Sequence, residues 1–320
     1  MNLKKIDKTN LNEITDQAVN LVLNSYDSVR EKMKFLPQKH NYYDVVKKGI
    51  TYLFSNGDGV IATENDKLLG FLYGYKVKEL FGSCEGIYCP LFGHSTLKHN
   101  KRDLYELLYE KAAENWCEEK YLSHVITLFS SDEELLETWF WLGFGNRCVD
   151  SIREVSKIYV ENDGIEIIKA NESDIKDIEN IYDRNNEYFL KSPLFMPSNN
   201  KISILDLYKW MKNKNHHLWI AYKNNEAIGY MKIQPKGESF ISLHDSVMNI
   251  TGAYVDEEYR NIKTGKILLS EIQKWLLKNG YKYCGVDFES FNILGSRFWN
   301  KYFTPYTFSL VRRIDERIAF

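Results

Sequence analysis

An amphipathic helix pattern follows Gly265 and is the clearest element of the chain. Its apolar positions recur three and four residues apart, the spacing of one buried helix face. They are Leu268, Ile272, Trp275 and Leu276. The polar turn at 279–280 ends the pattern, and the flanking segments 249–255 and 281–288 are rich in β-branched and aromatic residues, which predicts strands. We therefore expect a strand, a loop, a helix and a strand in this order.

A similar order of elements occurs earlier in the chain. Residues 86–89 parallel 252–255, and residues 70–73 parallel 229–232, at an offset of about 160 residues. This repetition predicts two copies of one α+β fold, in domains 1–160 and 161–320. The seam is expected at the polar turn near Gly164.

Composition limits the partners of the protein. The chain has 320 residues, 44% of them hydrophobic, which is enough for two packed cores. Its 42 Lys and Arg residues nearly balance 44 Asp and Glu residues, for a net charge of −2. A charge so close to zero disfavours nucleic acid and anionic membranes as partners.

Cysteine usage and hydropathy indicate a compartment. The five cysteines are an odd number without a Cys-x-x-Cys pair, as in proteins that keep reduced thiols. The N-terminal residues lack the apolar core of a secretory signal, and no run of eighteen apolar residues exists. We expect a cytoplasmic protein.

The loop at 255–267 is the main candidate for binding chemistry. It leads into the first turn of a helix, which offers unpaired N–H groups and the positive end of the helix dipole to a diphosphate. Arg260, Lys263 and Lys266 add positive charge, and Gly265 allows close approach of the main chain. A Walker loop is excluded because Ile267 stands where Ser or Thr is required.

These residues, with those that follow, resemble the GCN5-related N-acetyltransferase (GNAT) family. The family loop reads Arg/Gln-x-x-Gly-x-Gly/Ala, and Arg260 and Gly265 match it, whereas Lys263 replaces the first glycine. Downstream, the family pattern of Asn, a small residue and aromatics is matched by Asn292, Gly295, Phe298 and Phe303. Trp299 stands where the family often has tyrosine, and Tyr302 replaces a glycine.

The resemblance implies a fold and a ligand. The fold would be two GNAT-type mixed, twisted sheets flanked by helices, a tandem repeat in which the fourth and fifth strands of the second copy splay apart. Acetyl-coenzyme A would lie in that split as acyl donor, with no metal. Its pantetheine arm would meet the main chain at Tyr254 and Val255 and the side chain of Asn292. Its diphosphate would contact the loop residues Arg260, Asn261, Ile262, Lys263, Thr264, Gly265 and Lys266.

The first copy lacks this chemistry. Its corresponding loop, residues 92–101, has neither the Arg-x-x-Gly-x-Gly pattern nor a glycine at the helix start. His94, His99, Lys98 and Lys101 leave an anion site open as an alternative to an ordinary solvated loop. We expect the first copy to be a degenerate scaffold.

Acetyl transfer to an amine requires a base, because an alkylamine with a pKa of roughly 10 must lose a proton before it attacks a thioester. The fourth strand carries no carboxylate, but Asp287 and Glu289 share one face of the fifth strand. Glu289 is the candidate base and Tyr302 the candidate acid. Each residue also has a non-catalytic interpretation. Glu289 can be a solvated carboxylate at the strand surface, and Tyr302, beside Phe303, can be part of the hydrophobic core.

Three functions remain in view. The first is a cytoplasmic acetyl-coenzyme A-dependent N-acetyltransferase acting on a small-molecule or peptide amine. The second is a non-catalytic sensor of coenzyme A, consistent with Trp299 and the missing fourth-strand carboxylate. The third, an aminoacyl-transfer-RNA-dependent peptidyltransferase, would need a basic RNA-binding surface that the near-neutral charge does not supply. A metal site is not expected, because His216 and His217 are adjacent and point to different sides of one element.

Overall fold

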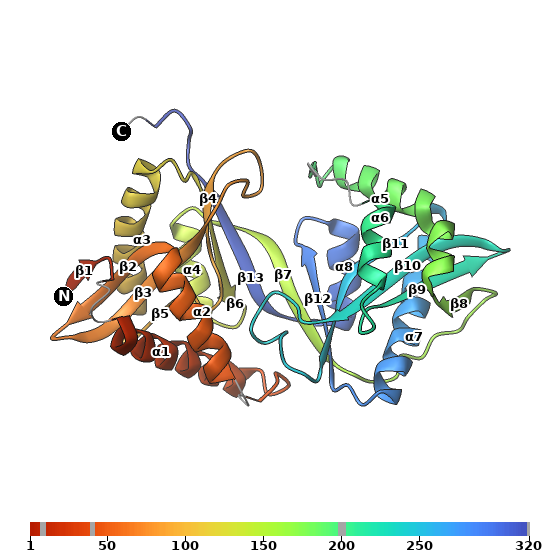
Figure 1. Ribbon diagram of the computed structural model, residues 1–320, viewed down its shortest axis with the longest axis horizontal. Helices are drawn as coiled ribbons and strands as arrows, with labels where there is room; N and C mark the ends of the chain where they lie inside the picture. Colours follow the sequence, from red (N-terminus) through yellow and green to blue (C-terminus); the bar gives the residue numbers. More distant parts are fainter. Residues whose placement is uncertain (7–10, 39–41, 198–202, 319–320) are drawn as a thin grey trace. The chain divides into compact units, whose positions relative to one another are not determined.

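The computed structural model describes residues 1–6, 11–38, 42–197 and 203–318 of the chain. They form two compact units. One unit comprises residues 1–149, 239–241 and 305–320, and the other comprises 150–238 and 242–304. Each unit is described separately below, with the element labels of Figure 1. Within the described part of the chain, every helix is too short or too polar to cross a membrane.

The first unit is a mixed sheet covered by helices. Its strands run in the order β1-β2-β3-β4-β6-β13, and β5 pairs with β3. Only the β4–β6 pair in this series is parallel. The strands are β1 (Asn2–Lys4), β2 (Asp58–Glu64), β3 (Lys67–Val77), β4 (Gly86–Cys89), β5 (His94–Thr96), β6 (Ser123–Phe129) and β13 (Thr304–Arg313). The helices are α1 (Leu11–Lys32), α2 (Tyr42–Asn56), α3 (Lys101–Glu118) and α4 (Glu133–Trp141).

The second unit repeats this plan. Its strands run in the order β12-β11-β10-β9-β8, with only β11 and β12 parallel. They are β8 (Glu166–Lys169), β9 (His217–Lys223), β10 (Glu226–Pro235), β11 (Val247–Val255) and β12 (Tyr283–Glu289). The helices are η2 (Glu172–Ile178), α5 (Glu179–Leu190), α6 (Ile204–Met211), η3 (Glu257–Ile262), α7 (Thr264–Lys278) and α8 (Ile293–Tyr302). In Figure 1, α7 lies on the opposite side of these strands from α5 and α6.

The two units share details of backbone conformation. The hairpin β2–β3 turns through Asn65 and Asp66, and the hairpin β9–β10 turns through Asn224 and Asn225. All four residues have positive φ angles, between 48° and 63°. Two consecutive residues of this kind form the type I′ turn that suits the twist of a hairpin, and Asn and Asp tolerate the conformation. The structure confirms the predicted α+β fold of mixed sheet and flanking helices, although the strands are connected in one sheet rather than two.

Each unit has its own hydrophobic core. In the first, Trp116 and Trp139 are buried with residues of β2, β3 and β6. In the second, Ile178, Ile181 and Tyr182 pack against β9 and β10. These apolar faces stabilise each sheet by removing its side chains from water.

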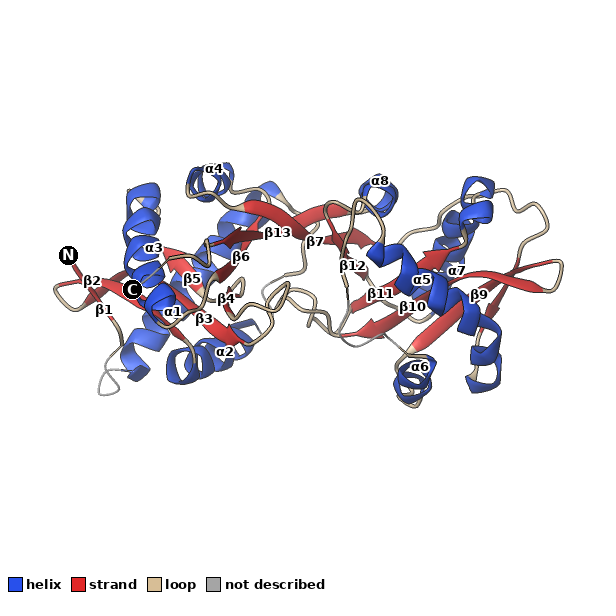
Figure 2. Ribbon diagram, turned by 90° about the horizontal axis from the view of Figure 1, so that it is seen from above, coloured by secondary structure: helices blue, strands red, loops and turns tan. Residues whose placement is uncertain are grey.

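The boundary at 160/161 was predicted from the repeat in the sequence. It stays a prediction. The compact units divide differently, because β7 (Gly145–Glu154) passes from the first unit into the second, and β13 belongs to the first. Figure 2 shows β13 beside β6. The two strands pair antiparallel from Thr307↔Phe129 to Arg313↔Ser123. The last strand of the chain thus completes the sheet of the first unit.

Candidate active site

The strands β11 and β12 separate partway along their length. They pair in parallel from Val247↔Tyr283 to Ile250↔Val286, and no further pair follows. Yet β11 continues to Val255 and β12 to Glu289. The four paired residues of β11 are buried, whereas the last five are only partly buried. This geometry confirms the predicted splay and leaves one edge of β11 open.

Backbone direction shows which amides face this split. The N–H of Asp256 donates to the carbonyl of Ile228 on β10, at 3.0 Å. N–H directions alternate along an antiparallel strand, so Tyr254, opposite Tyr230, also directs its N–H toward β10. The amides of Ala253 and Val255 therefore face the split. Val255 was predicted as a main-chain contact, and Ala253 was missed because strand phase cannot be read from one sequence.

The loop after β11 ends in a left-handed residue. It consists of the short helix η3, then Lys263 with φ 68° and ψ 12°, and then α7. Lys263 stands where the family loop has its first glycine, and the backbone keeps the conformation that glycine adopts readily. No side chain caps the first turn of α7. Its first N–H groups therefore lack side-chain acceptors, as the predicted diphosphate site requires.

Substitutions at Lys263 should reveal this backbone strain. A β-branched residue adopts positive φ with more difficulty than lysine, whereas glycine adopts it freely. We expect Lys263→Val to lower the free energy of unfolding by roughly 1–2 kcal/mol relative to Lys263→Gly. Both variants remove the same charge, so urea unfolding compares them without an electrostatic difference. Equal stability of the two variants would show that the position does not require positive φ.

Other loop residues have structural roles that the sequence did not show. A Cβ atom on Gly265 would lie 3.3 Å from the ring of Phe298 in α8, so the close approach here is to that ring. The hydroxyl of Thr264 is buried and donates to the carbonyl of Tyr259 at 2.8 Å. Asn261 and Ile262 are exposed, and Lys266 is half-buried.

Arg260 turns away from the first turn of α7. Its Nε donates to the carbonyl of Val255 at 3.0 Å. Its guanidinium lies 5.0 Å from the ring centre of Tyr188 and 5.5 Å from that of Tyr254. Burial raises the pKa of both tyrosines, and Arg260 opposes that rise. Both hydroxyls therefore keep their protons near neutral pH.

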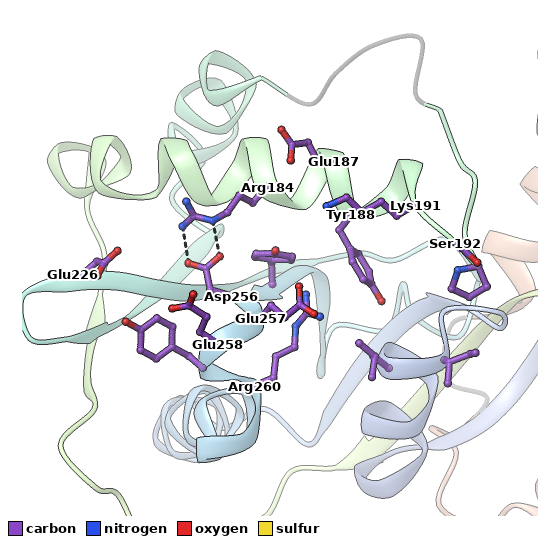
Figure 3. A pocket seen from close by; sticks show the side chains of 15 residues that line it. Arg184, Glu187, Tyr188, Lys191, Ser192, Glu226, Asp256, Glu257, Glu258 and Arg260 are labelled. Carbon is purple, nitrogen blue, oxygen red and sulfur yellow. Dashed lines mark hydrogen bonds and ion pairs between the residues drawn. The ribbon is translucent and has the colours of Figure 1, made fainter.

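A pocket of about 910 Å³ opens beside Arg260. Figure 3 shows its side chains converging from α5 and from the segment after β11. Arg184 on α5 forms a two-pronged ion pair with Asp256, at 2.7 and 2.6 Å. The lining residues are Arg184, Glu187, Tyr188, Lys191, Ser192, Pro193, Glu226, Tyr254, Asp256, Glu257, Glu258, Tyr259, Arg260, Ile293 and Leu294.

Asn292 lies at the base of α8 next to this pocket. Its Oδ1 accepts hydrogen bonds from the N–H of Gly295 at 3.1 Å and from the hydroxyl of Tyr188 at 2.8 Å. The first bond caps the helix, which is the usual role of an Asn at this position. The second fixes Tyr188, so the side chain predicted to contact pantetheine also links α8 to α5.

The two predicted catalytic side chains lie in different surroundings. Glu289 is the last residue of β12, and its backbone carbonyl accepts from the N–H of Asn292 at 3.0 Å. Tyr302 is the last residue of α8, its ring packs against Phe298, and it is not among the residues that line the pocket. Trp299 is buried against Phe303. Glu289 therefore contacts Asn292 through its backbone, and neither Glu289 nor Tyr302 is among the residues that line the pocket.

Asp287 on β12 is a carboxylate with a raised pKa. Its side chain reaches solvent, yet surrounding protein atoms enclose it on most sides. This enclosure raises the pKa of Asp287 to about 6, Glu238 adds to the rise, and Lys232 on β10 opposes it. A carboxylate with a pKa near neutrality suits general base catalysis. The sequence placed Asp287 beside Glu289 on one strand face but gave no sign of this environment.

The corresponding region of the first unit is filled by its own side chains. Asn100, which precedes α3, is also left-handed, with φ 55°. The next residue, Lys101, binds both carboxylate oxygens of Asp132 at 2.8 and 2.9 Å. His94 is buried and bonded to Tyr105, and burial lowers its pKa to about 4. Lys101 and His94 therefore have internal partners, which weakens the anion-site alternative.

Asp287 and Glu289 of β12 have no acidic counterparts at the corresponding positions of β6. Because β6 and β12 are both seven residues long, Thr127 occupies the place of Asp287 and Phe129 that of Glu289. Strand β6 thus has no carboxylate at either of these two positions.

Comparison with known proteins agrees with this fold. The model of the "Acetyltransferase (GNAT) family" matches residues 177–301. A GCN5-related N-acetyltransferase from Sphaerobacter thermophilus superposes with a TM-score of 0.64 at 11% identity, over 100% of this chain and 97% of that one.

A second structure extends the likeness to a protein described as tandem. This tandem GNAT protein from the clavulanic acid biosynthesis pathway gives a TM-score of 0.55 at 10% identity, over 98% of both chains. A search of curated proteins found no match. The family match supports acyl transfer as the general reaction class. Residues 177–301 therefore match the model of the GNAT acetyltransferase family, and the chain as a whole has the fold of the GCN5-related N-acetyltransferases.

Proposed function

We propose that the second half of the chain transfers an acetyl group from acetyl-coenzyme A to an amine in the cytoplasm. The observation that carries this proposal is the separation of β11 from β12 beyond Ile250 and Val286. The separation leaves the end of β11 without a strand partner on one side, next to a helix start without a side-chain cap. An extended chain with amide groups and a diphosphate fits both features.

The residues present suit the two ends of this donor. Among the described strands, residues 251–255 of β11 have only β10 as a paired neighbour. An open strand edge of this kind binds an extended ligand as an added strand, so the N–H of Val255 would pair with a pantetheine amide. The first turn of α7, with Lys263 and Lys266, would hold the diphosphate.

Catalysis then requires the chain to take a proton from the amine. Asp287 is the base that its surroundings favour, and Glu289, two residues along the same face, is the alternative from the sequence. The N–H of Ala253, which lies farther along β11 from the diphosphate loop than Val255 does, would stabilise the negative charge that develops on the thioester oxygen. Tyr302 as the acid for the departing thiolate stays a prediction. Thioester cleavage tolerates a weak acid, because a thiol has a pKa of about 8.5.

The direct test is binding and turnover. Calorimetry with acetyl-coenzyme A, followed by measurement of free thiol over a broad panel of amines, should show binding and amine-dependent thiol release. Binding without release would favour the sensor alternative. Absence of both would contradict the proposed function.

Coenzyme A binding should be confined to the second unit, with one site per chain. We expect Gly265→Val to weaken the affinity about tenfold or more, because the added branches meet Phe298 and displace the first turn of α7. The matched control is Arg102→Val, since Arg102 is the second residue of α3 as Gly265 is of α7. Two sites per chain, or equal effects of both substitutions, would contradict this assignment.

A further inference from the structure

Lys232 extends from β10 across the neighbouring strand β11. A Cβ atom on Gly252 would lie 2.5 Å from Cε of Lys232 and 3.3 Å from its Cγ and Cδ. The lysine stem therefore covers the backbone of Gly252, which is paired with Lys232 in the strand register. Because Gly252 lies beyond Ile250, where β11 and β12 separate, the side chain heads toward the split.

The ammonium group of Lys232 lies 5.2 Å from the ring centre of Trp210 on α6. The indole N–H of Trp210 donates to Oε1 of Gln234 at 2.6 Å, which fixes the ring. Lys232 and Asp287 influence each other electrostatically, but no salt bridge within 4.0 Å joins them in the part of the chain that the structure describes. A cation on β10 and a carboxylate on β12 thus lie near enough to interact electrostatically without forming a salt bridge.

The surroundings of Lys232 favour the binding of an anion. Burial lowers the pKa of Lys232, and Asp287 opposes that effect. A partly desolvated ammonium gains free energy when an anion binds it, and it repels a ligand that is only cationic. A simple alkylamine would meet this repulsion on its way to Asp287. A ligand with both charges would satisfy both groups.

We propose that the acyl acceptor is an amine that also carries an anionic group, a carboxylate or a phosphate, which Lys232 binds while the amine faces Asp287. This assignment deepens the proposed function and rests on it. Lys232 is then a residue that determines substrate specificity. Gly252 has no side chain and therefore leaves room for the methylene groups of Lys232.

The test compares pairs of ligands that differ only in the anionic group. Calorimetry would measure binding of N-acetylated 4-aminobutyrate against N-acetylbutylamine, and of N-acetylated O-phosphoethanolamine against N-acetylethanolamine, to the full chain saturated with coenzyme A. These ligands are analogues of the reaction product, so binding is read without turnover. We expect the anionic member of at least one pair to bind about 10- to 100-fold more tightly, the usual gain from a charge-assisted contact. The pair that responds distinguishes carboxylate from phosphate.

Two variants attribute the preference to Lys232. Lys232→Met keeps the stem and removes the charge, and it should abolish the difference within the pair. Gly252→Ala keeps the charge but displaces the lysine tip, and it should reduce the difference with little effect on folding. Lys223→Met, on the adjacent strand β9, is the control and should leave the difference unchanged.

The outcomes separate this proposal from the proposed function. Coenzyme A binding without any preference for anionic ligands would overturn the acceptor class alone, as would a preference that survives Lys232→Met. A failure to bind any of the four ligands would overturn it as well. Loss of coenzyme A binding would contradict the proposed function, and with it the acceptor class that rests on that function.

Discussion

Replacement of Asp287 by Asn is expected to lower kcat about 10²–10⁴-fold, the usual effect of removing a general base. The amide keeps the size of the side chain but cannot accept the amine proton. Coenzyme A affinity should change little, because Asp287 lies apart from the first turn of α7 that would hold the diphosphate. Stopped assays of thiol release with a substrate found by screening would measure the effect.

The pH profile gives this prediction a second readout. A base acts in its ionised form, and the pKa of Asp287 is raised to about 6. The activity of the wild-type protein should therefore rise as the pH increases through about 6 and level off above it. Asp287→Asn should lose this rise.

Stability should not fall in the same variant. The folded pKa of Asp287 lies above its ordinary value of 3.8, so the folded state prefers the protonated carboxyl. Stability from this group is complete below the unfolded pKa and declines as the pH rises toward 6. An uncharged Asn should thus maintain or raise the melting temperature at neutral pH. Loss of activity together with unfolding would remove the support for a catalytic role.

Glu289→Gln is the matched control on the same strand face. If Asp287 is the base, the Glu289 variant should stay within a few-fold of the wild-type rate. A large loss in Glu289→Gln with near-normal activity in Asp287→Asn would reverse the assignment. Large losses in both would indicate that the two carboxylates act together.

Much of the second unit could be predicted because its signals are local. The apolar spacing of α7 and the strand-like segments beside it depend on nearby residues, and the structure has all three elements. Lys263 replaces the family glycine, and it has the positive φ angle that glycine adopts readily. Asn100 shows the same conformation before α3, although nothing in its loop resembled the motif.

The environment of the site could not be predicted, because distant segments create it. Tyr188 and Arg184 come from α5, which no motif connects to the loop after β11. The orientation of Arg260 depends on the carbonyl of Val255 and on two aromatic rings. The raised pKa of Asp287 depends on enclosure by elements that are remote in sequence. A single sequence contains these residues but not their proximity.

The position of β13 shows most clearly that the neighbour of a strand depends on tertiary contacts. It follows the second copy in the sequence, and no pattern in the sequence predicted its neighbour. It pairs with β6 of the first unit. Strand patterns specify that a segment is extended, but the choice of neighbour depends on contacts that the pattern does not record.

A fragment of residues 1–160 should therefore fail to fold as a stable domain. It lacks β13, whose buried residues Tyr306, Thr307 and Leu310 belong to the first unit. Without this partner, β6 would present an unpaired and apolar edge, which favours aggregation. Circular dichroism and gel filtration of the fragment, alone and with a peptide of residues 304–318 added, would test this. We expect the peptide to restore a cooperative unfolding transition.

The same contact can be tested in the full chain. Leu310 packs in the core of the first unit with Ile126 and Trp139. We expect Leu310→Ala to lower the free energy of unfolding by about 2–5 kcal/mol, the usual cost of a large-to-small change in a core. Val311→Ala, at the next and less buried position of β13, should cost clearly less. A cooperatively folded 1–160 fragment, together with equal effects of the two substitutions, would mean that the first unit is complete without β13.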